Sequence, residues 1–182
     1  MAKDKKAVVV VDMLNDFITG ALGFDRGRAT VEPIGRLLAA ARARGICVIY
    51  TNDAHLPGLD KELELWGAHA LAGTAGAQVI PELAPQAGDF IVPKRRYSGF
   101  FQTGLQLLLE ELEVGDIILT GVHTHMCVQH TAADAFNWGY RLEVPLECTN
   151  AFTEENYQSG LKYLKEVYGA RLACLEEILA SF

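Results

Sequence analysis

The sequence predicts an α/β fold, a three-layer sandwich in which a six-stranded parallel sheet carries helices on both faces. Two observations lead to this fold class. Short apolar runs alternate with helical stretches along the whole chain, a pattern typical of right-handed βαβ crossovers. The runs 7–11, 46–50 and 116–120 are also nearly continuously apolar, as expected for parallel strands that are covered on both faces.

The predicted strands are the apolar runs taken in chain order. They span 7–11, 46–50, 90–92, 116–120, 141–144 and 171–174. Cys47 and Cys174 fall inside two of these runs, so we expect both thiols to be core residues. No repeat, low-complexity tract or linker breaks the alternation. The 182 residues are therefore predicted to form a single domain, 1–182.

The predicted helices lie between the strands. They span 31–44, 102–112, 127–138 and a stretch that begins after Thr153 and ends at Gly169. Gly45 and Gly139 end the first and third of them, because glycine takes the backbone conformation that closes a helix. Thr153 is the expected N-cap of the last helix, whose apolar stripe is Tyr157, Leu161, Leu164 and Tyr168.

Charge and cysteine usage limit the partners and the compartment. With 16 basic and 23 acidic side chains the net charge is −7, and the strongest basic run, 94–96, is short, so no nucleic-acid binding is expected. The apolar run 7–11 is too short for a signal-peptide core or a membrane span. The four cysteines form no C-x-x-C pair. These features favour reduced thiols in a cytoplasmic protein without a membrane partner.

Two connections are longer than a βα loop requires. Residues 13–29 follow the first predicted strand, and residues 54–77 follow the second. Irregular loops beyond about 12–15 residues are usually functional or disordered. Both leave the carboxyl ends of strands, where ligands bind in open α/β sheets. We therefore expect the two loops to form the walls of one pocket.

Three chemically matched side chains follow three predicted strands and form a candidate triad. Asp12 is either a turn cap or a partly buried carboxylate with a raised pKa that can accept and return a proton. Cys127 is either a core residue or a thiol at a helix start, where backbone amides would lower its pKa and could hold an oxyanion. Lys94 either ends its strand in solvent or stabilises charge inside the pocket.

The loop 54–77 and the residues before it offer metal ligands. Asp53 and His55 form a D-x-H motif, and Glu62 and His69 come later in the same loop, a set of oxygen and nitrogen ligands suited to a divalent ion. The rival motif is the H-x-H of His123 and His125. It is typical of larger metal-dependent barrels, which need about 200–250 residues. His130 is expected to serve packing.

Longer motifs connect these candidates. They are V-V-V-V-D-M-L-N-D-F at 8–17, T-N-D-A-H at 51–55, E-L-E-L-W-G-A-H at 62–69, G-T-A-G-A at 73–77, P-K-R-R-Y-S-G-F at 93–100 and T-G-V-H-T-H-M-C-V at 120–128. Through them essentially the whole chain resembles the isochorismatase-like cysteine hydrolases. Within that family it is most similar to the nicotinamidases (pyrazinamidases), chiefly through the metal loop.

The resemblance implies a cysteine amidohydrolase. Cys127 would attack an amide carbonyl to form a thioester, Asp12 would pass the thiol proton to departing ammonia, and Lys94 would support both charges. The backbone amides of His123 and Cys127 would form the oxyanion hole, with a non-proline cis peptide at Val122–His123.

The resemblance also implies a substrate site. Asp53, His55 and His69, with Glu62 as a fourth contact, would hold a divalent metal that binds the pyridine nitrogen. Zinc is the expected ion, with iron or manganese as alternatives. Phe17, Tyr97, Trp66 and Val122 would contact the substrate.

The function that follows is hydrolysis of nicotinamide to nicotinate and ammonia in NAD salvage. Nicotinamidases usually carry Asp where this chain has His125, so another small amide or a ureido or carbamoyl substrate is the alternative. Isochorismate hydrolysis is disfavoured, because those enzymes lack the nucleophilic cysteine. A different class of function, a catalytically silent binding or assembly subunit, stays open. Family members suggest a homo-oligomer, a dimer or a tetramer.

Overall fold

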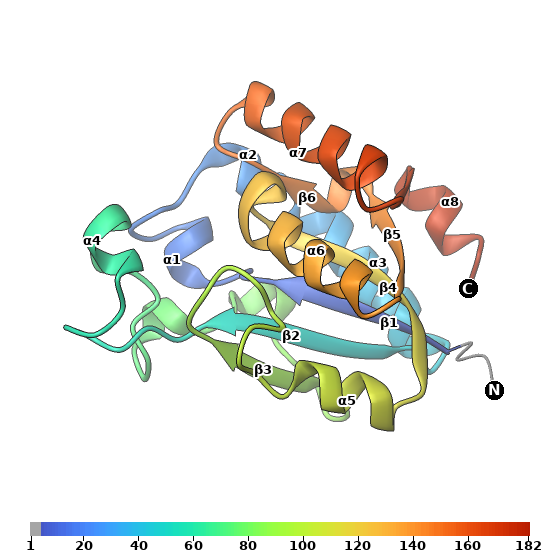
Figure 1. Cartoon of the computed structure of the whole chain (residues 1–182), viewed down its shortest axis with the longest axis horizontal. Helices are drawn as coiled ribbons and strands as arrows, with labels where there is room; N and C mark the ends of the chain where they lie inside the picture. Colours follow the sequence, from blue (N-terminus) through green and yellow to red (C-terminus); the bar gives the residue numbers. More distant parts are fainter. Residues whose placement is uncertain (1–4) are drawn as a thin grey trace.

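The computed structural model describes residues 5–182; the first four residues of the predicted domain lie outside the described part. Its centre is a parallel sheet (Figure 1). The strands are β1 (Lys5–Val11), β2 (Cys47–Asp53), β3 (Phe90–Lys94), β4 (Val114–Val122), β5 (Arg141–Pro145), β6 (Thr149–Asn150) and β7 (Arg171–Ala173). Their order is β3-β2-β1-β4-β5-β7. The six predicted strands are confirmed, and the added β6 is a two-residue pairing with β4.

The valine run of β1 places this strand in the middle of the sheet. Val9 pairs with Ile49 of β2 on one side and with Leu119 of β4 on the other. Successive side chains point to opposite faces, so Val9 packs into one hydrophobic core and Val8 into the other. Residues 7–11 of β1 are apolar at every position. Both faces of this strand therefore need a layer of helices to exclude water.

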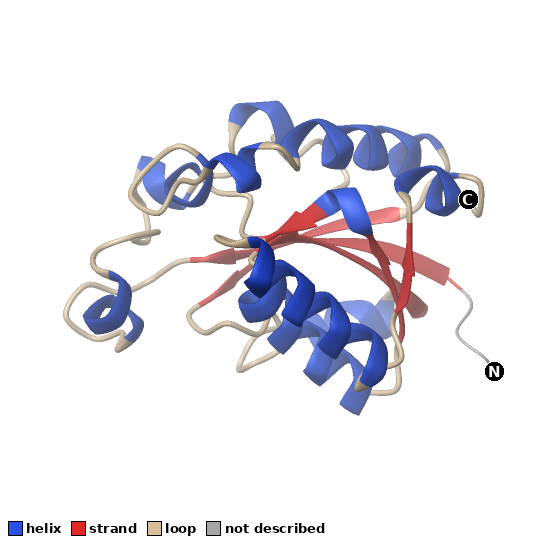
Figure 2. Ribbon diagram, turned by 90° about the horizontal axis from the view of Figure 1, so that it is seen from above, coloured by secondary structure: helices blue, strands red, loops and turns tan. Residues whose placement is uncertain are grey.

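Helices cover both faces of the sheet (Figure 2). The elements are α1 (Asn15–Ile18), α2 (Asp25–Arg28), α3 (Val31–Ala43), α4 (Glu62–Trp66), α5 (Leu105–Glu111), α6 (Gln129–Asn137), α7 (Glu154–Glu166) and α8 (Leu175–Leu179). Buried side chains of α5, α6 and α7 join the core on one face, and those of α3 and α8 join the core on the other. The predicted three-layer class is confirmed. Within residues 5–182 no helix is both long enough and apolar enough to cross a membrane.

Several predicted boundaries differ from the structure. The helix expected over 102–112 begins at Leu105, because residues before Gly104 form a turn in which the Thr103 hydroxyl accepts a hydrogen bond from the Leu105 N–H. The helix expected over 127–138 is α6, and Cys127 lies before it, in a π-helical turn over Thr124–Val128. The N-cap at Thr153 is confirmed, since its hydroxyl accepts from the Asn156 N–H at 3.1 Å.

The prediction that Cys47 and Cys174 are core residues is wrong for Cys174 and holds in part for Cys47, which lies in β2 and packs against one hydrophobic core. Both are only partly buried. Cys174 lies beyond β7 at the N-cap of α8, where its Sγ donates to a Glu177 carboxylate oxygen at 3.3 Å. All four cysteines are free thiols, and Cys127 and Cys148 are the buried ones. The apolar pattern located the strands but not the residue at which each strand leaves the core.

The closest backbone approach in the sheet provides a test of the fold. Gly121 of β4 pairs with Val11 of β1, has a φ of 104°, and would place a Cβ 2.0 Å from the Val11 carbonyl oxygen. We expect Gly121→Ala to lower the free energy of unfolding by about 3 kcal/mol or more, as measured by urea denaturation. The matched control is Gly45→Ala. Gly45 has a φ of 68° but open space around it, so the loss there is expected to be about 1–2 kcal/mol. Equal losses for the two variants would contradict the close approach.

Candidate active site

The carboxyl ends of four adjacent parallel strands converge on one site. Asp12 directly follows β1, Asp53 ends β2, and Lys94 ends β3. Cys127 follows β4 in the π-helical turn. Asp12 has a φ of 53°, a left-handed backbone conformation that aspartate tolerates better than most residues. The strand order therefore gathers residues that are more than 100 positions apart in the sequence.

The buried ammonium group of Lys94 lies at the centre of this site. Its Nζ is 2.7 Å from Asp12 Oδ2, 2.6 Å from Asp53 Oδ1 and 3.8 Å from Cys127 Sγ. Lys94, Asp12 and Cys127 are each at most 4% exposed. The Asp53 N–H donates to Asp12 Oδ1 at 2.8 Å and fixes that carboxylate. The structure thus brings the three predicted triad residues together, and it adds Asp53 as a second carboxylate partner of Lys94.

Burial and neighbouring charges set the protonation states of these groups. Burial, reinforced by the charge of Asp53, raises the pKa of Asp12 to about 6, as the sequence predicts. Burial would lower the pKa of Lys94, but the two carboxylates overcome this effect and raise the pKa well above its ordinary value. Lys94 therefore stays charged.

The predicted lowering of the Cys127 pKa is wrong. Burial raises the pKa of this thiol well above its ordinary value, although the positive charge of Lys94 acts in the opposite direction. The nearby carboxylates of Asp12 and Asp53 also raise it. Backbone amides at the helix start do not offset this environment. Cys127 consequently keeps its proton at neutral pH until a base removes it.

The turn that leads to Cys127 has the backbone conformation that the family resemblance implies. The peptide bond between Val122 and His123 is cis. The His123 carbonyl accepts hydrogen bonds from the N–H groups of Met126 and Val128, at 2.9 and 3.3 Å. These bonds hold the turn around Cys127. The oxyanion hole formed by the His123 and Cys127 amides stays a prediction.

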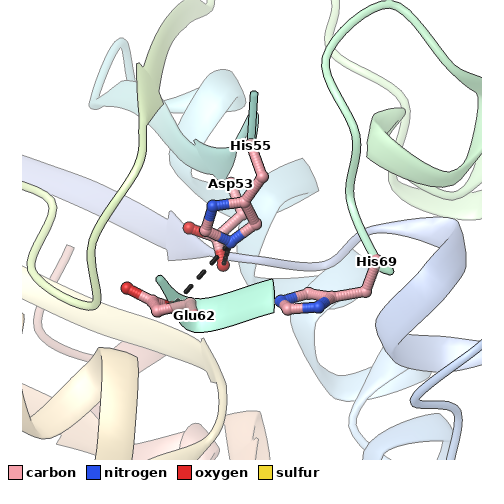
Figure 3. Close-up of side chains that lie close together, drawn as sticks. All are labelled: Asp53, His55, Glu62 and His69. Atoms are coloured by element: carbon pink, nitrogen blue, oxygen red, sulfur yellow. Dashed lines mark ion pairs between the residues drawn. The ribbon is translucent and has the colours of Figure 1, made fainter. Parts of the chain in front are cut away.

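A group of four metal-ligating side chains adjoins the triad. Each of Asp53, His55, Glu62 and His69 offers one ligand atom, and these atoms all lie within 4.8 Å of one another (Figure 3). All four side chains are buried. The Nε2 of His55 lies 3.5 Å from Asp53 Oδ2 and 3.8 Å from Glu62 Oε2. Among the described residues, neither His123 nor His125 belongs to such a group.

The hydrogen bonds behind the two histidines fit a metal site. His55 Nδ1 lies 3.3 Å from Asp60 Oδ2, and His69 Nδ1 lies 2.8 Å from the Gly67 carbonyl oxygen. A carboxylate or carbonyl on one ring nitrogen is the usual way of orienting a metal-binding histidine. Within residues 5–182 the buried His55 Nε2 has no hydrogen-bond partner. The residues present therefore fit a divalent ion bound by nitrogen and oxygen.

Asp60 and Arg95 are functional residues that the sequence reasoning missed. The guanidinium of Arg95 donates two hydrogen bonds, from Nε at 3.0 Å and from Nη2, to Asp60 Oδ1. These bonds lower the pKa of Asp60, whose other oxygen faces His55. Asp60 lies within the loop that carries the predicted ligands, so its place in that loop was the available signal. Arg95 had no signal beyond its position next to Lys94.

A small cavity connects the thiol to the metal-ligating group. Its volume is about 20 Å³, and its lining includes Cys127, Asp53, Glu62 and His69. A cavity of this size holds about one water molecule. The Trp66 indole N–H donates to the Tyr97 hydroxyl at 3.1 Å across the exposed side of the cavity. This hydrogen bond links two of the aromatic side chains that line the cavity.

Most of the predicted substrate contacts line this cavity. Phe17, Trp66 and Tyr97 do so, and Phe152 is an aromatic wall that the sequence reasoning missed. Val122 does not line it, because its side chain is fully buried in the core on one face of the sheet. His130, expected to serve packing, is exposed, with its ring centroid 5.2 Å from that of Tyr97.

The structure is a three-layer α/β sandwich whose parallel sheet carries Cys, Asp and Lys side chains at its carboxyl edge. This combination is typical of cysteine hydrolases of the α/β type. A sequence profile described as Isochorismatase domain matches residues 6–177. The chain belongs to the isochorismatase family. The resemblance noted in the sequence is thereby confirmed, as is its enzyme class, a hydrolase of C–N amide bonds, at the level of the family. A single domain spanning 1–182 stays a prediction.

The relatives act on several substrates. Among solved structures, N-carbamoylsarcosine amidase from Thermoplasma acidophilum is 38% identical, with 95% of this chain and 98% of that chain covered and a TM-score of 0.89. Nicotinamidase PncA from Bacillus subtilis is 30% identical, with 93% and 99% covered and a TM-score of 0.89. The ureidoacrylate amidohydrolase RutB of Agrobacterium fabrum is 35% identical over 74% of this chain and 71% of its own length. The substrate of this chain must therefore be inferred from the residues that line its cavity.

The protonation of the metal-ligating group predicts pH-dependent metal binding. Burial raises the pKa of Glu62 to about 7. Burial would lower the pKa of His55, but the adjacent Asp53 carboxylate raises it. Because both groups must lose a proton to bind a metal, we expect zinc affinity to fall as pH falls below about 7, by about 10- to 100-fold per pH unit. Chelator competition between pH 5.5 and 8 measures this dependence.

The matched control for this prediction is Glu62→Gln, which removes one titrating group. It should bind zinc more weakly but with a shallower pH dependence than the unchanged protein. Zinc affinity that is constant from pH 5.5 to 8, in a protein that stays folded, would contradict the assignment.

Proposed function

We propose that this enzyme hydrolyses nicotinamide to nicotinate and ammonia through a thioester on Cys127. One observation carries the proposal: a single cavity is lined both by the Cys127 thiol and by Asp53, Glu62 and His69 of the metal-ligating group. A pyridine carboxamide carries two groups that match these two ends, a carbonyl carbon and a ring nitrogen. The aromatic side chains of Phe17, Trp66 and Phe152 between them suit a flat ring.

The first chemical step joins the thiol to the amide. Ligand atoms of Asp12, Asp53 and Cys127 lie within 4.8 Å of one another, so the Asp12 carboxylate is close enough to take the thiol proton as Sγ attacks the carbonyl carbon. A base is required because the raised pKa of Cys127 keeps the thiol protonated. The Sγ–C bond forms, and the carbonyl electrons move to the oxygen. The backbone amides of His123 and Cys127 would stabilise that oxyanion.

The second step releases the product. Asp12 returns its proton to the nitrogen, the C–N bond breaks, and ammonia leaves a thioester. Asp12 then takes a proton from water, whose oxygen attacks the thioester carbon. The C–Sγ bond breaks, Asp12 returns that proton to the sulfur, and the acid leaves and loses its own proton to solvent as nicotinate. Lys94 keeps its charge throughout and stabilises the anionic thiolate 3.8 Å away.

The metal-ligating group would orient the substrate. A bound divalent ion supplies a Lewis acid that holds the ring nitrogen. Zinc suits the two imidazoles and two carboxylates, and iron or manganese is the alternative. Asp60 and the Gly67 carbonyl orient His55 and His69, which would hold such an ion together with Asp53 and Glu62.

A second candidate substrate is a carbamoyl or ureido amide. It is favoured by the similarity to N-carbamoylsarcosine amidase, 38% identical, and to RutB. The same thiol chemistry would act on such a substrate, without need of a ring-binding metal. A catalytically silent binding subunit is disfavoured, because packing alone does not require a buried Asp, Lys and Cys together. The place in NAD salvage, the cytoplasmic location and the homo-oligomer stay predictions.

Ammonia release tests the proposed function. The purified, zinc-loaded protein is expected to release ammonia from nicotinamide, and Cys127→Ala is expected to lower kcat/KM by about 10⁴-fold or more, because the nucleophile is lost. Removal of the metal by a chelator should also abolish turnover, and added zinc should restore it. A coupled ammonia assay measures all three samples.

The matched control is Cys174→Ala, which removes a thiol far along the chain from the site and should leave turnover unchanged. If nicotinamide is not hydrolysed but a carbamoyl or ureido amide is, in a Cys127-dependent reaction, the second substrate class holds. If no amide is hydrolysed and Cys127 resists alkylation, the catalytic proposal is wrong.

The role of Asp12 predicts a pH profile. Burial raises its pKa to about 6, and only the ionised carboxylate can accept the thiol proton. We expect kcat/KM to rise with pH through about 6 and to fall about tenfold per pH unit below it. The profile is measured at saturating zinc, so that loss of metal does not contribute. A flat profile down to pH 5 would contradict Asp12 as the base, and Asp12→Asn should be inactive at every pH.

A further inference from the structure

The side chain of His123 has no part in the proposed chemistry, which uses only its backbone. It nevertheless lines the cavity beside Cys127 and is 3% exposed. Its ring packs against those of Phe24 and Phe152, with centroid separations of 4.5 and 4.1 Å and interplanar angles of 24° and 30°, and these two phenyl rings contact each other at 4.9 Å. Phe17 meets it edge-on at 6.2 Å. Three phenyl rings therefore hold the imidazole in one orientation.

Both nitrogens of this imidazole lack a hydrogen-bond partner. Neither Nδ1 nor Nε2 of His123 meets a polar group of the described residues. Of the described side chains that line the cavity, only His123 has an unpaired buried polar atom. Such atoms are rare in folded proteins, because each loses its bond to water without replacement. An apolar ring of similar shape would pack against these phenylalanines without this cost.

The charge state of His123 limits what it can bind. Burial, reinforced by His125, lowers its pKa to about 3, so the ring is neutral at physiological pH. A neutral imidazole offers one N–H donor and one nitrogen acceptor. It therefore matches a neutral polar group and not an anion. The His123 side chain lines the same cavity as the Cys127 thiol, so a substrate bound at the thiol would lie within reach of the imidazole.

We propose that the His123 side chain is a specificity-determining group that hydrogen-bonds a polar atom of the substrate other than the reacting amide. This inference rests on the proposed function and narrows its substrate class. The preferred substrate is a flat heteroaromatic carboxamide with a further hydrogen-bonding ring atom or substituent. Sites built to pair with a polar group discriminate strongly against analogues that lack it, because the buried protein group is then left unpaired.

The test compares substrates and variants together. Nicotinamide, pyrazinamide (one additional ring nitrogen) and ring-hydroxylated or ring-aminated nicotinamides are assayed with the zinc-loaded enzyme and with His123→Phe. At least one polar analogue is expected to exceed nicotinamide in kcat/KM by about tenfold or more with the unchanged enzyme, and this preference should disappear in His123→Phe. Comparing the two ratios removes the electronic effect of each substituent on the reaction itself.

Thermal unfolding separates recognition from a structural role. His123→Phe removes two unpaired polar atoms. The Tm of this variant is therefore expected to lie between that of the unchanged protein and a value about 2–4 °C higher. A substantially lower Tm would show that the imidazole serves the fold. His123→Asn and His123→Gln place an amide near Nδ1 or Nε2, so one of them should restore part of the preference even if the larger phenyl ring packs poorly.

The controls distinguish the outcomes. His130→Phe changes an exposed histidine whose Nδ1 is bonded to the Met126 carbonyl, and it should leave all substrate ratios unchanged. If every ratio also stays within threefold in His123→Phe, Asn and Gln, the inference is overturned while the proposed function stands. If the unchanged enzyme hydrolyses none of these carboxamides, the proposed function fails first and the inference fails with it.

Discussion

The buried ion cluster around Lys94 is the interaction on which the site depends. Removing an ammonium group from water costs several kcal/mol, and only closely placed opposite charges can offset this. Asp12 and Asp53 provide them, at 2.7 and 2.6 Å. The three charges come from the ends of β1, β2 and β3, which are adjacent in the sheet. A different strand order would separate these side chains and leave a buried charge without its partner. The site therefore depends on the order of the strands.

Asp53 connects the two halves of the site. One of its oxygens pairs with Lys94, and the other faces His55. Burial would raise its pKa, but the charge of Lys94 and the adjacent His55 imidazole lower it, so the carboxylate stays ionised toward both neighbours. The proposed thiol chemistry and the proposed metal site thus share one side chain. A change in either half alters the electrostatic environment of the other.

The sequence predicted the parts of the structure that depend on local pattern. The valine run of β1 and the cap at Thr153 are local signals, and both were found. The pairing of Asp60 with Arg95 and the rings around His123 depend on segments far apart in the chain, so no spacing indicated them. The Cys127 pKa was wrongly predicted because burial outweighs the helix amides, and burial is known only from the assembled fold.

The five-residue helix α4 contributes both to the metal-ligating group and to the wall of the cavity. It begins with Glu62, a member of the metal-ligating group, and ends with Trp66, which closes the cavity against Tyr97. Gly67 follows directly, with a φ of 75°. Because one turn of helix joins the ligand to the wall, a substitution that shifts α4 would move both at once. Selection for a differently shaped cavity at this helix would therefore also act on the metal-ligating group.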